Sequence, residues 1–198
     1  MESRMYLIID GSCLFSAINN LRRRKVEFKN KKLDIGKFCF CMRLLWKGYT
    51  HETVRCVFYF KKDDARLREL LIIPDSTNPG IKDHWQIKEC AESLATIPES
   101  EIAKLPEQYH DNFQRAEKGL DIRLVCDTLQ LVSSGRTNNI VLFVNDSDYV
   151  PFFEALQNLG SNTYLVALDN GFNINKKLAE LADVYKTLES FLNTFFVD

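Results

Sequence analysis

Several signals are missing from this sequence, and each absence excludes a class of protein. No apolar run is long enough to cross a bilayer, and the apolar stretch near the N-terminus is too short for a secretory signal. The six cysteines form no CxxC pair and show no Cys/His spacing typical of zinc. We therefore expect a cytoplasmic protein without membrane association, whose thiols are reduced.

Common nucleotide-binding and hydrolase motifs are missing too. No GxGxxG follows the first apolar stretch and no GxxxxGK is present, so neither dinucleotide nor P-loop chemistry is indicated. There is no GxSxG elbow, and the three histidines lie in polar segments where a surface position is expected. A net charge of -1 gives no overall attraction to nucleic acid.

What is present indicates one globular domain over residues 1–198. A hydrophobic content of 45% and a charged content of 27% are typical of a folded soluble chain. Short β-branched runs alternate with segments of helical spacing, which predicts an α/β fold with a mainly parallel sheet. The expected strands are residues 5–9, 54–60, 140–144, 162–168 and 184–188, while residues 84–90 fit either a strand or a helix.

Residues 139–159 are the most informative stretch. A buried strand at 140–144 ends in Asn145, Asp146, Ser147 and Asp148, and apolar residues then recur at helical spacing. In open α/β sheets, ligands bind beyond the carboxyl ends of the strands. The alternative is local: Asp148 is an N-cap and Asp146 a turn residue.

Four aspartates are expected at this edge of the sheet. Asp10 ends the first strand, Asp146 and Asp148 follow the central one, and Asp121 opens the helix that leads to it. Carboxylates held close together repel unless a cation is present, and oxygen ligands suit Mg²⁺ or Mn²⁺. Such an ion can activate water beside a phosphodiester. Asp127 lies six residues past Asp121 on another helical face, where a supporting or structural role is expected.

Basic residues gather after the first helix, where a loop is predicted. Arg22, Arg23, Arg24 and Lys25 begin a block that extends to residue 32. The block fits either a solvated face or a contact with a phosphate backbone. Lys118 fits either a phosphate contact or a partner that offsets the nearby carboxylates.

Four stretches together resemble the NYN domain family, a branch of the PIN-like nuclease superfold. They are LIIDGS at 7–12, EKGLDIRLVCD at 117–127, NIVLFVNDSDYVPFFEAL at 139–156 and LAELADVYKTL at 178–188. The resemblance implies a Rossmann-like three-layer α/β/α sandwich and metal-dependent cleavage of RNA. It implies catalytic and metal-binding roles for Asp10, Asp121, Asp146 and Asp148. Beside these acids we expect supporting roles for Ser12, Asp127 and Asn145.

The resemblance also implies nucleic-acid contacts by Lys118, beside those predicted for Arg22, Arg23, Arg24 and Lys25. This chain departs from the family pattern at Cys13, often Asn in the family, and at Asn145, often Gly. Residues 81–115 are longer than a minimal member needs, which indicates an insertion that shapes the substrate groove or contacts a protein partner or a second copy.

Two rival functions remain open. One is a catalytically weak RNA- or protein-binding regulator on the same fold, which the departures at Cys13 and Asn145 allow. The other is haloacid-dehalogenase-type phosphoryl transfer, which also begins with a strand and an aspartate. That chemistry needs a second acid two residues after the first, where this chain has Ser12.

Overall fold

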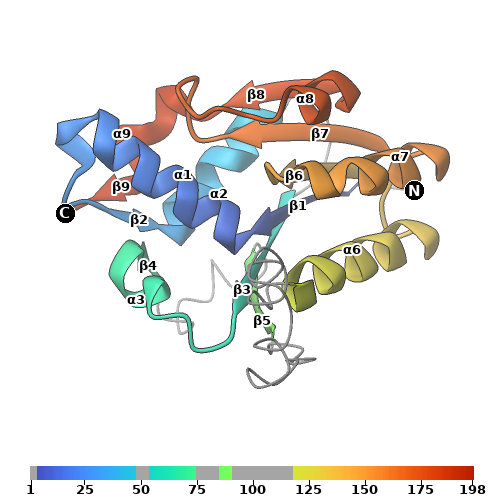
Figure 1. Ribbon diagram of the computed structural model, residues 1–198, viewed down its shortest axis with the longest axis horizontal. Coiled ribbons are helices and arrows are strands. Elements are labelled where there is room, and N and C mark those ends of the chain that lie inside the picture. Colours follow the sequence, from blue (N-terminus) through green and yellow to red (C-terminus); the bar gives the residue numbers. More distant parts are fainter. Residues whose placement is uncertain (1–3, 48–53, 75–84, 91–117) are drawn as a thin grey trace, which may run out of the picture.

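The main sheet is built from six parallel strands. The computed structural model describes residues 4–47, 54–74, 85–90 and 118–198, and within them the strand order is β5-β3-β1-β6-β7-β8 (Figure 1). The strands are β1 (Met5–Asp10), β3 (Val54–Lys61), β5 (Trp85–Cys90), β6 (Asn139–Phe143), β7 (Asn162–Ala167) and β8 (Val184–Thr187). The first strand of the sheet thus lies beside the fourth, as in doubly wound nucleotide-binding folds.

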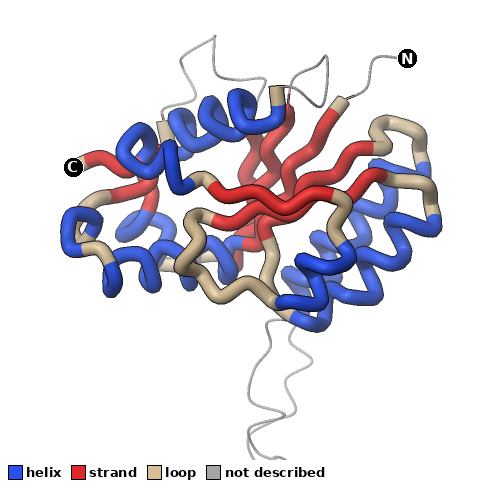
Figure 2. The backbone as a smooth tube through the Cα atoms, turned by 90° about the horizontal axis from the view of Figure 1, so that it is seen from above, coloured by secondary structure: helices blue, strands red, loops and turns tan. Residues whose placement is uncertain are grey.

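Helices cover both faces of this sheet, and Figure 2 shows the strands between the two groups. One face packs against α1 (Gly11–Arg24), α2 (Ile35–Trp46) and α9 (Leu192–Phe195). The other packs against α6 (Lys118–Ser133), α7 (Val150–Asn158) and α8 (Lys176–Leu181). The predicted three-layer α/β/α sandwich with a parallel sheet is therefore confirmed. No helix in the described ranges has the length and apolar character of a membrane span.

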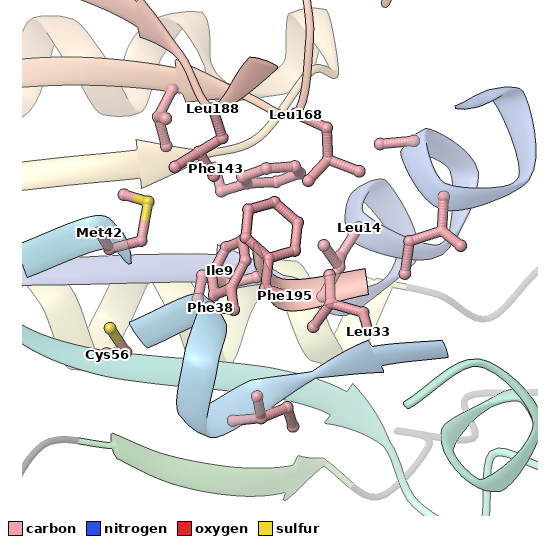
Figure 3. Close-up of a cluster of buried hydrophobic side chains, with 14 of the residues drawn as sticks. Ile9, Leu14, Leu33, Phe38, Met42, Cys56, Phe143, Leu168, Leu188 and Phe195 are labelled. Carbon is pink, nitrogen blue, oxygen red and sulfur yellow. The ribbon is translucent and has the colours of Figure 1, made fainter. Parts of the chain in front are cut away.

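Strand β1 is buried on both sides. Ile9 packs in the core on the α1 and α2 side, and Ile8 packs in the core on the α6 and α7 side, because side chains alternate along a strand. Phe38 and Phe195 meet in the first core, with ring centroids 5.4 Å apart (Figure 3). Each such buried side chain contributes roughly 1.5–3 kcal/mol. The two cores together fix the end of β1.

A second, smaller sheet was not predicted. It has the order β4-β2-β9 and consists of β2 (Lys32–Asp34), β4 (Leu71–Ile72) and β9 (Phe196–Val197). Strand β2 is parallel to β4 and antiparallel to β9. Strands of two or three residues are too short to show an alternating pattern, so only the folded chain shows these pairings.

The five expected strands are all observed, and residues 85–90 form a strand rather than a helix. The predicted loop at the basic block is wrong in part. Arg22, Arg23 and Arg24 form the last turn of α1, and η1 (Val26–Phe28) follows, because cations are favoured at a helix C-terminus. Of the expected insertion at 81–115, residues 85–90 form β5 of the main sheet, and residues 81–84 and 91–115 lie outside the described ranges.

Candidate active site at the switch point of the sheet

The candidate site lies where the chain leaves β1 and β6, which are neighbours in the sheet. From β1 the chain turns into α1 on one face, and from β6 it passes through η3 (Ser147–Tyr149) into α7 on the other. The strand order reverses at this point, and ligands of doubly wound proteins bind in the crevice that results. Figure 1 shows α1 and α6 beginning near this edge.

Asp10 ends β1 and caps α1. Its Oδ1 accepts hydrogen bonds from the backbone N–H groups of Ser12 at 2.8 Å and Cys13 at 3.3 Å. Gly11 allows the start of α1 to approach β3 closely, because a Cβ there would lie 2.5 Å from the carbonyl oxygen of Tyr59 on β3. Asp10 is only 6% exposed. One carboxylate oxygen is thus fixed by the helix, and the other faces the opposite side of the switch point.

Tyr149 connects Asp10 to Asp121. The Tyr149 hydroxyl lies 3.1 Å from Oδ2 of Asp10 and 2.9 Å from Oδ1 of Asp121. Asp121 lies in the first turn of α6 rather than at the predicted cap, because the helix begins at Lys118. Three side chains from β1, α6 and η3 therefore meet at one phenol oxygen.

Burial and charge govern the protonation of this group. Burial, followed by the nearby charge of Asp121, raises the pKa of Asp10 to about 6, although hydrogen bonds from Cys13, Ser12 and Tyr149 act against this rise. Burial, followed by the charges of Asp10 and Asp121, raises the pKa of Tyr149 far above its ordinary value. The phenol therefore keeps its proton at every physiological pH.

The shared hydroxyl cannot satisfy both carboxylates. A phenol carries one proton and can donate it fully to only one acceptor at a time. When Asp10 and Asp121 are both ionised, one of the two close oxygen pairs has no proton between its atoms. Either a second proton on Asp10 or a nearby cation would relieve that repulsion. Burial is the larger cause of the raised pKa of Asp10, and the nearby charge of Asp121 adds to it.

A pocket of about 240 Å³ opens beside these residues. Its lining includes Asp10, Asp121 and Asp146, together with Ser12 and Asn145 among the predicted supporting residues. The remaining lining residues, Cys13, Ser16 and Phe172, complete the wall. Burial raises the pKa of the Cys13 thiol well above its ordinary value, so this departure from the family pattern places a neutral thiol in the pocket wall.

Asp146 and Asp148 take different positions. Asp146 is the N-cap of η3, and its Oδ1 accepts from the Asp148 backbone N–H at 3.0 Å. Both residues are exposed, but only Asp146 lines the pocket. The capping role that the local alternative gave to Asp148 thus belongs to Asp146, which caps the turn while it faces the pocket.

Asn145 connects the end of β6 to the loop before α8. Its Nδ2 donates to the carbonyl of Asn173 at 3.1 Å, and its Oδ1 accepts from the Asn175 backbone N–H at 2.6 Å. Asn175 in turn caps α8 through the N–H groups of Lys177 and Leu178. The side-chain oxygen of Asn145 is therefore engaged in holding the loop that carries Phe172 of the pocket wall.

Asp127 belongs to a separate cluster further along α6. It accepts hydrogen bonds from Lys88 Nζ at 2.6 Å, from Tyr59 Oη at 3.2 Å and from Arg123 Nε at 3.1 Å. Burial acts to raise the pKa of Asp127, but the hydrogen bonds and charges of Lys88 and Arg123 outweigh it and lower the pKa. Asp127 therefore holds α6 against β3 and β5, and it does not line the pocket.

Asp183, which lies in the last of the four stretches that resemble the family, also has internal partners. Its Oδ2 accepts from the Thr163 backbone N–H at 2.6 Å and from the Thr163 hydroxyl at 3.2 Å. These contacts join the turn before β8 to β7 and place Asp183 in a structural position.

Two residues of the basic block are paired with acids. Arg24 Nη2 lies 2.8 and 2.9 Å from the two carboxylate oxygens of Asp169, which is 1% exposed. Lys25 Nζ lies 3.1 Å from Glu189 and 3.9 Å from Asp169. These ion pairs hold the end of α1 against the loop after β7. Nucleic-acid contacts by Arg24 and Lys25 stay a prediction, and their observed partners are carboxylates.

The other predicted cations differ from these. Arg22 donates to the carbonyl of Lys31, and its buried Nε has no hydrogen-bond partner among the described residues. Arg23 is exposed, and its Nε makes a long contact of 3.4 Å with the carbonyl of Asn19. The side chain of Lys118 lies outside the described part of the molecule.

The donor set of the pocket fits a hard divalent cation. Within the described ranges, no three His, Cys, Asp or Glu side chains converge closely enough to hold a metal ion by themselves. Mg²⁺, however, commonly uses only one or two carboxylates and fills its other positions with water and substrate phosphate. Asp10 and Asp121, joined at one hydroxyl, provide such a pair, and Asp146 lies in the same pocket wall.

Sequence reasoning missed the contribution of Tyr149. Its position at the start of an apolar helical pattern indicated a core residue, and the ring is indeed 2% exposed. Buried tyrosines usually find a partner for their hydroxyl, but the two partners, Asp10 and Asp121, lie on other elements and only the fold brings them to Tyr149. Ser16, one turn after Ser12 on α1, was missed for lack of any such signal.

The fold and the pocket define a Rossmann-like α/β protein with aspartates gathered at the switch point of its sheet. The family model of the NYN domain matches residues 80–189, more than half of the chain. The chain therefore belongs to the NYN domain family, which confirms the predicted resemblance. No curated protein and no solved structure matches the chain significantly.

Membership places the chain in the PIN-like nuclease superfamily and supports a nuclease or RNA-related role. The matched range contains Asp121 and Asp146, whereas Asp10 precedes it. Only the fold brings Asp10 to the other two acids, through the pairing of β1 with β6.

Proposed function

We propose that this protein is a metal-dependent endoribonuclease that hydrolyses RNA phosphodiester bonds at the pocket between β1 and β6. The observation that carries the proposal is the convergence of Asp10 and Asp121 on the Tyr149 hydroxyl beside an open pocket. Two carboxylates held this close, one with its pKa raised to about 6, form a site that a cation would stabilise.

Asp10, Asp121 and Asp146 are the proposed metal-binding residues. A bound Mg²⁺ or Mn²⁺ would supply a water of lowered pKa and neutralise charge on the phosphodiester. Tyr149 keeps its proton and orients the two carboxylates through its hydroxyl. Ser12 lies at the N-terminus of α1, where backbone N–H groups favour a phosphate oxygen. Asp148 remains a candidate ligand that substitution has to test.

The wider expectations form part of the same proposal. The substrate is RNA, the basic block contacts its backbone, and the protein works in the cytoplasm. A protein partner or a second copy is expected to bind through residues 81–115. The chemistry proposed for the pocket does not depend on these expectations, so the roles of the aspartates can be tested first.

The experiment that tests the proposal uses labelled single-stranded and structured RNAs, with DNA of the same sequence. Each is incubated with Mn²⁺, Mg²⁺ or EDTA. Wild type should cleave RNA only with metal, and Asp146→Asn should lower kcat/KM by more than about 100-fold, because even the outer partners of metal ligands are worth roughly 10–100-fold. Asp148→Asn shows whether Asp148 belongs to the set, and Glu154→Gln on the exposed side of α7 is the charge-matched control.

The second candidate is the regulatory module that binds RNA or protein with weak catalysis. It is favoured by one observation: within the described ranges, no three acidic or other metal-binding side chains converge as they stand. A folded wild-type protein that binds Mn²⁺ but cleaves none of the RNAs would select this candidate and reject the nuclease.

A further inference from the structure

One polar face of α1 leads away from the acidic pocket. Ser12, Ser16, Asn19 and Arg23 follow at i, i+4, i+7 and i+11, which places them in one row along the helix. Ser12 and Ser16 line the acidic pocket. Asn19 and Arg23 line a second pocket at the far end of α1. The row therefore connects two hollows that lie on one side of a single helix.

The second pocket, of about 650 Å³, is basic. Arg22, Arg23 and Lys29 line it together with Asn19 and Val26. Val26 is 80% exposed and adds an apolar surface among the cations. The sequence of α1 contains no acidic residue, so no carboxylate on the helix repels an anion that lies along the row.

These cations are not fully explained by the stability of the fold. Arg24 and Lys25 are paired with Asp169 and Glu189. These two cations also lie at the C-terminus of α1, where the helix dipole favours positive charge. Arg23, by contrast, makes within the described ranges only the long contact with a carbonyl oxygen given above. Arg24 and Lys25 thus hold a loop, Arg23 and Lys29 line the basic pocket, and Arg22 both lines that pocket and donates to the Lys31 carbonyl.

From this arrangement we infer that the α1 face is a track for single-stranded RNA, which runs from the scissile phosphate in the acidic pocket to a phosphate subsite formed by Arg22, Arg23 and Lys29. The inference rests on the proposed nuclease function and adds a substrate class to it. The eleven residue steps from Ser12 to Arg23 span about 16 Å along the helix axis. This corresponds to roughly five nucleotides of a stacked strand, which rises about 3.4 Å per nucleotide, and to fewer in an extended one.

The inferred track predicts that cleavage depends on substrate length. A dinucleotide can fill the acidic pocket but cannot reach the basic one, whereas an oligonucleotide of about twelve nucleotides can. The ratio of kcat/KM for the long RNA to that for the dinucleotide should fall about tenfold in Arg23→Gln/Lys29→Gln. The dependence of log KM on log salt should become shallower by about 1.4, or about 0.7 for each lost contact with a single strand.

Two features make the test specific. Arg43→Gln, which removes an exposed cation on α2 that lines neither pocket, should leave the length ratio at its wild-type value. In a series of long RNAs, one phosphate at a time is replaced by a neutral methylphosphonate. In wild type, the replacement two to five nucleotides from the cut should raise KM by about as much as the loss of one phosphate contact. The same replacement should have no effect in Arg23→Gln/Lys29→Gln.

Binding to uncleaved RNA in EDTA, followed by fluorescence anisotropy, separates this inference from the nuclease proposal. If wild type cleaves RNA but the length ratio is the same in Arg23→Gln/Lys29→Gln, the track is refuted and the nuclease stands. If no RNA is cleaved but the double variant loses affinity and salt dependence, the nuclease is rejected and the α1 face is retained as an RNA-binding track without a scissile phosphate. A polyglutamate peptide that competes as strongly as RNA of equal charge would overturn the track in favour of an acidic protein partner.

Discussion

Replacement of Asp10 by asparagine should stabilise the metal-free protein at neutral pH, although it removes a proposed metal ligand. The introduced amide keeps an oxygen that can accept from the N–H groups of Ser12 and Cys13, and asparagine caps helices as well as aspartate does. Its NH₂ group can donate to the Tyr149 hydroxyl, whose own proton is then free for Asp121. The conflict at the shared hydroxyl is thus removed without a change in side-chain shape.

The size of the effect follows from the pKa of Asp10. The pKa is raised by burial, and then by Asp121, from 3.8 to about 6. A rise of about two units corresponds to ~3 kcal/mol. Because the folded-state pKa is the higher one, the folded protein holds the proton more tightly, so this stability is fully present below pH 3.8 and is lost as the pH rises through about 6. Asp10→Asn should therefore exceed wild type by ~3 kcal/mol at pH 8 and by less than ~1 kcal/mol at pH 4.

The assay is urea unfolding of both proteins in EDTA at pH 4, 6 and 8, with the difference in unfolding free energy taken at each pH. Titration of groups that do not interact with Asp10 cancels in that difference. Asp146→Asn is the matched control, because Asp146 is exposed and its replacement should change stability little at any pH. An Asp10→Asn protein that is less stable than wild type at pH 8 would refute the reasoning. Addition of Mn²⁺ at pH 8 should stabilise wild type and not Asp10→Asn.

Three further substitutions test other parts of the structure. Gly11→Ala should destabilise the protein by roughly 1–3 kcal/mol or more, because the added methyl would lie 2.5 Å from a backbone oxygen of β3; a thermal shift assay that shows no loss would contradict the close approach of α1 to β3. Asp127→Asn should cost roughly 1–3 kcal/mol at pH 7 because Lys88 loses its anion. Since the pKa of Asp127 is lowered, the difference from wild type should disappear as the pH falls below 3.8, and a constant difference in urea unfolding would count against the ion pair. Tyr149→Phe removes a hydrogen bond that lowers the pKa of Asp10, so the acid limb of the pH profile of kcat/KM should move to higher pH. An unchanged acid limb would show that the Tyr149 hydroxyl does not influence the protonation of Asp10 during cleavage.

The layers of the fold could be predicted because each main strand carries its own signal. The apolar runs at 140–144 and 164–168 are continuous, as expected for strands covered on both faces. The small sheet could not be predicted, since β2, β4 and β9 are too short for any periodicity. Its pairings join the start, the middle and the end of the described chain, and a local pattern contains no information on such contacts.

The acids of the site could be predicted from their places after strands, but their partners could not. The sequence places Asp146 and Asp148 in the same short segment, and only the turn geometry of η3 decides that Asp146 faces the pocket. The basic block shows the same limit. Its charge is evident in the sequence, whereas the pairing of Arg24 with Asp169 depends on residues 145 positions apart.

The origin of the three acids has a consequence for when the pocket exists. Asp10 comes from the first half of the main sheet, Asp146 from the second half, and Asp121 from the helix between them. A chain in which only one half has folded cannot assemble the group, however native that half is. Under the proposed function, a chain that is still being synthesised or is locally unfolded would therefore be inactive. Activity would begin only when β1 pairs with β6 and brings the three acids together.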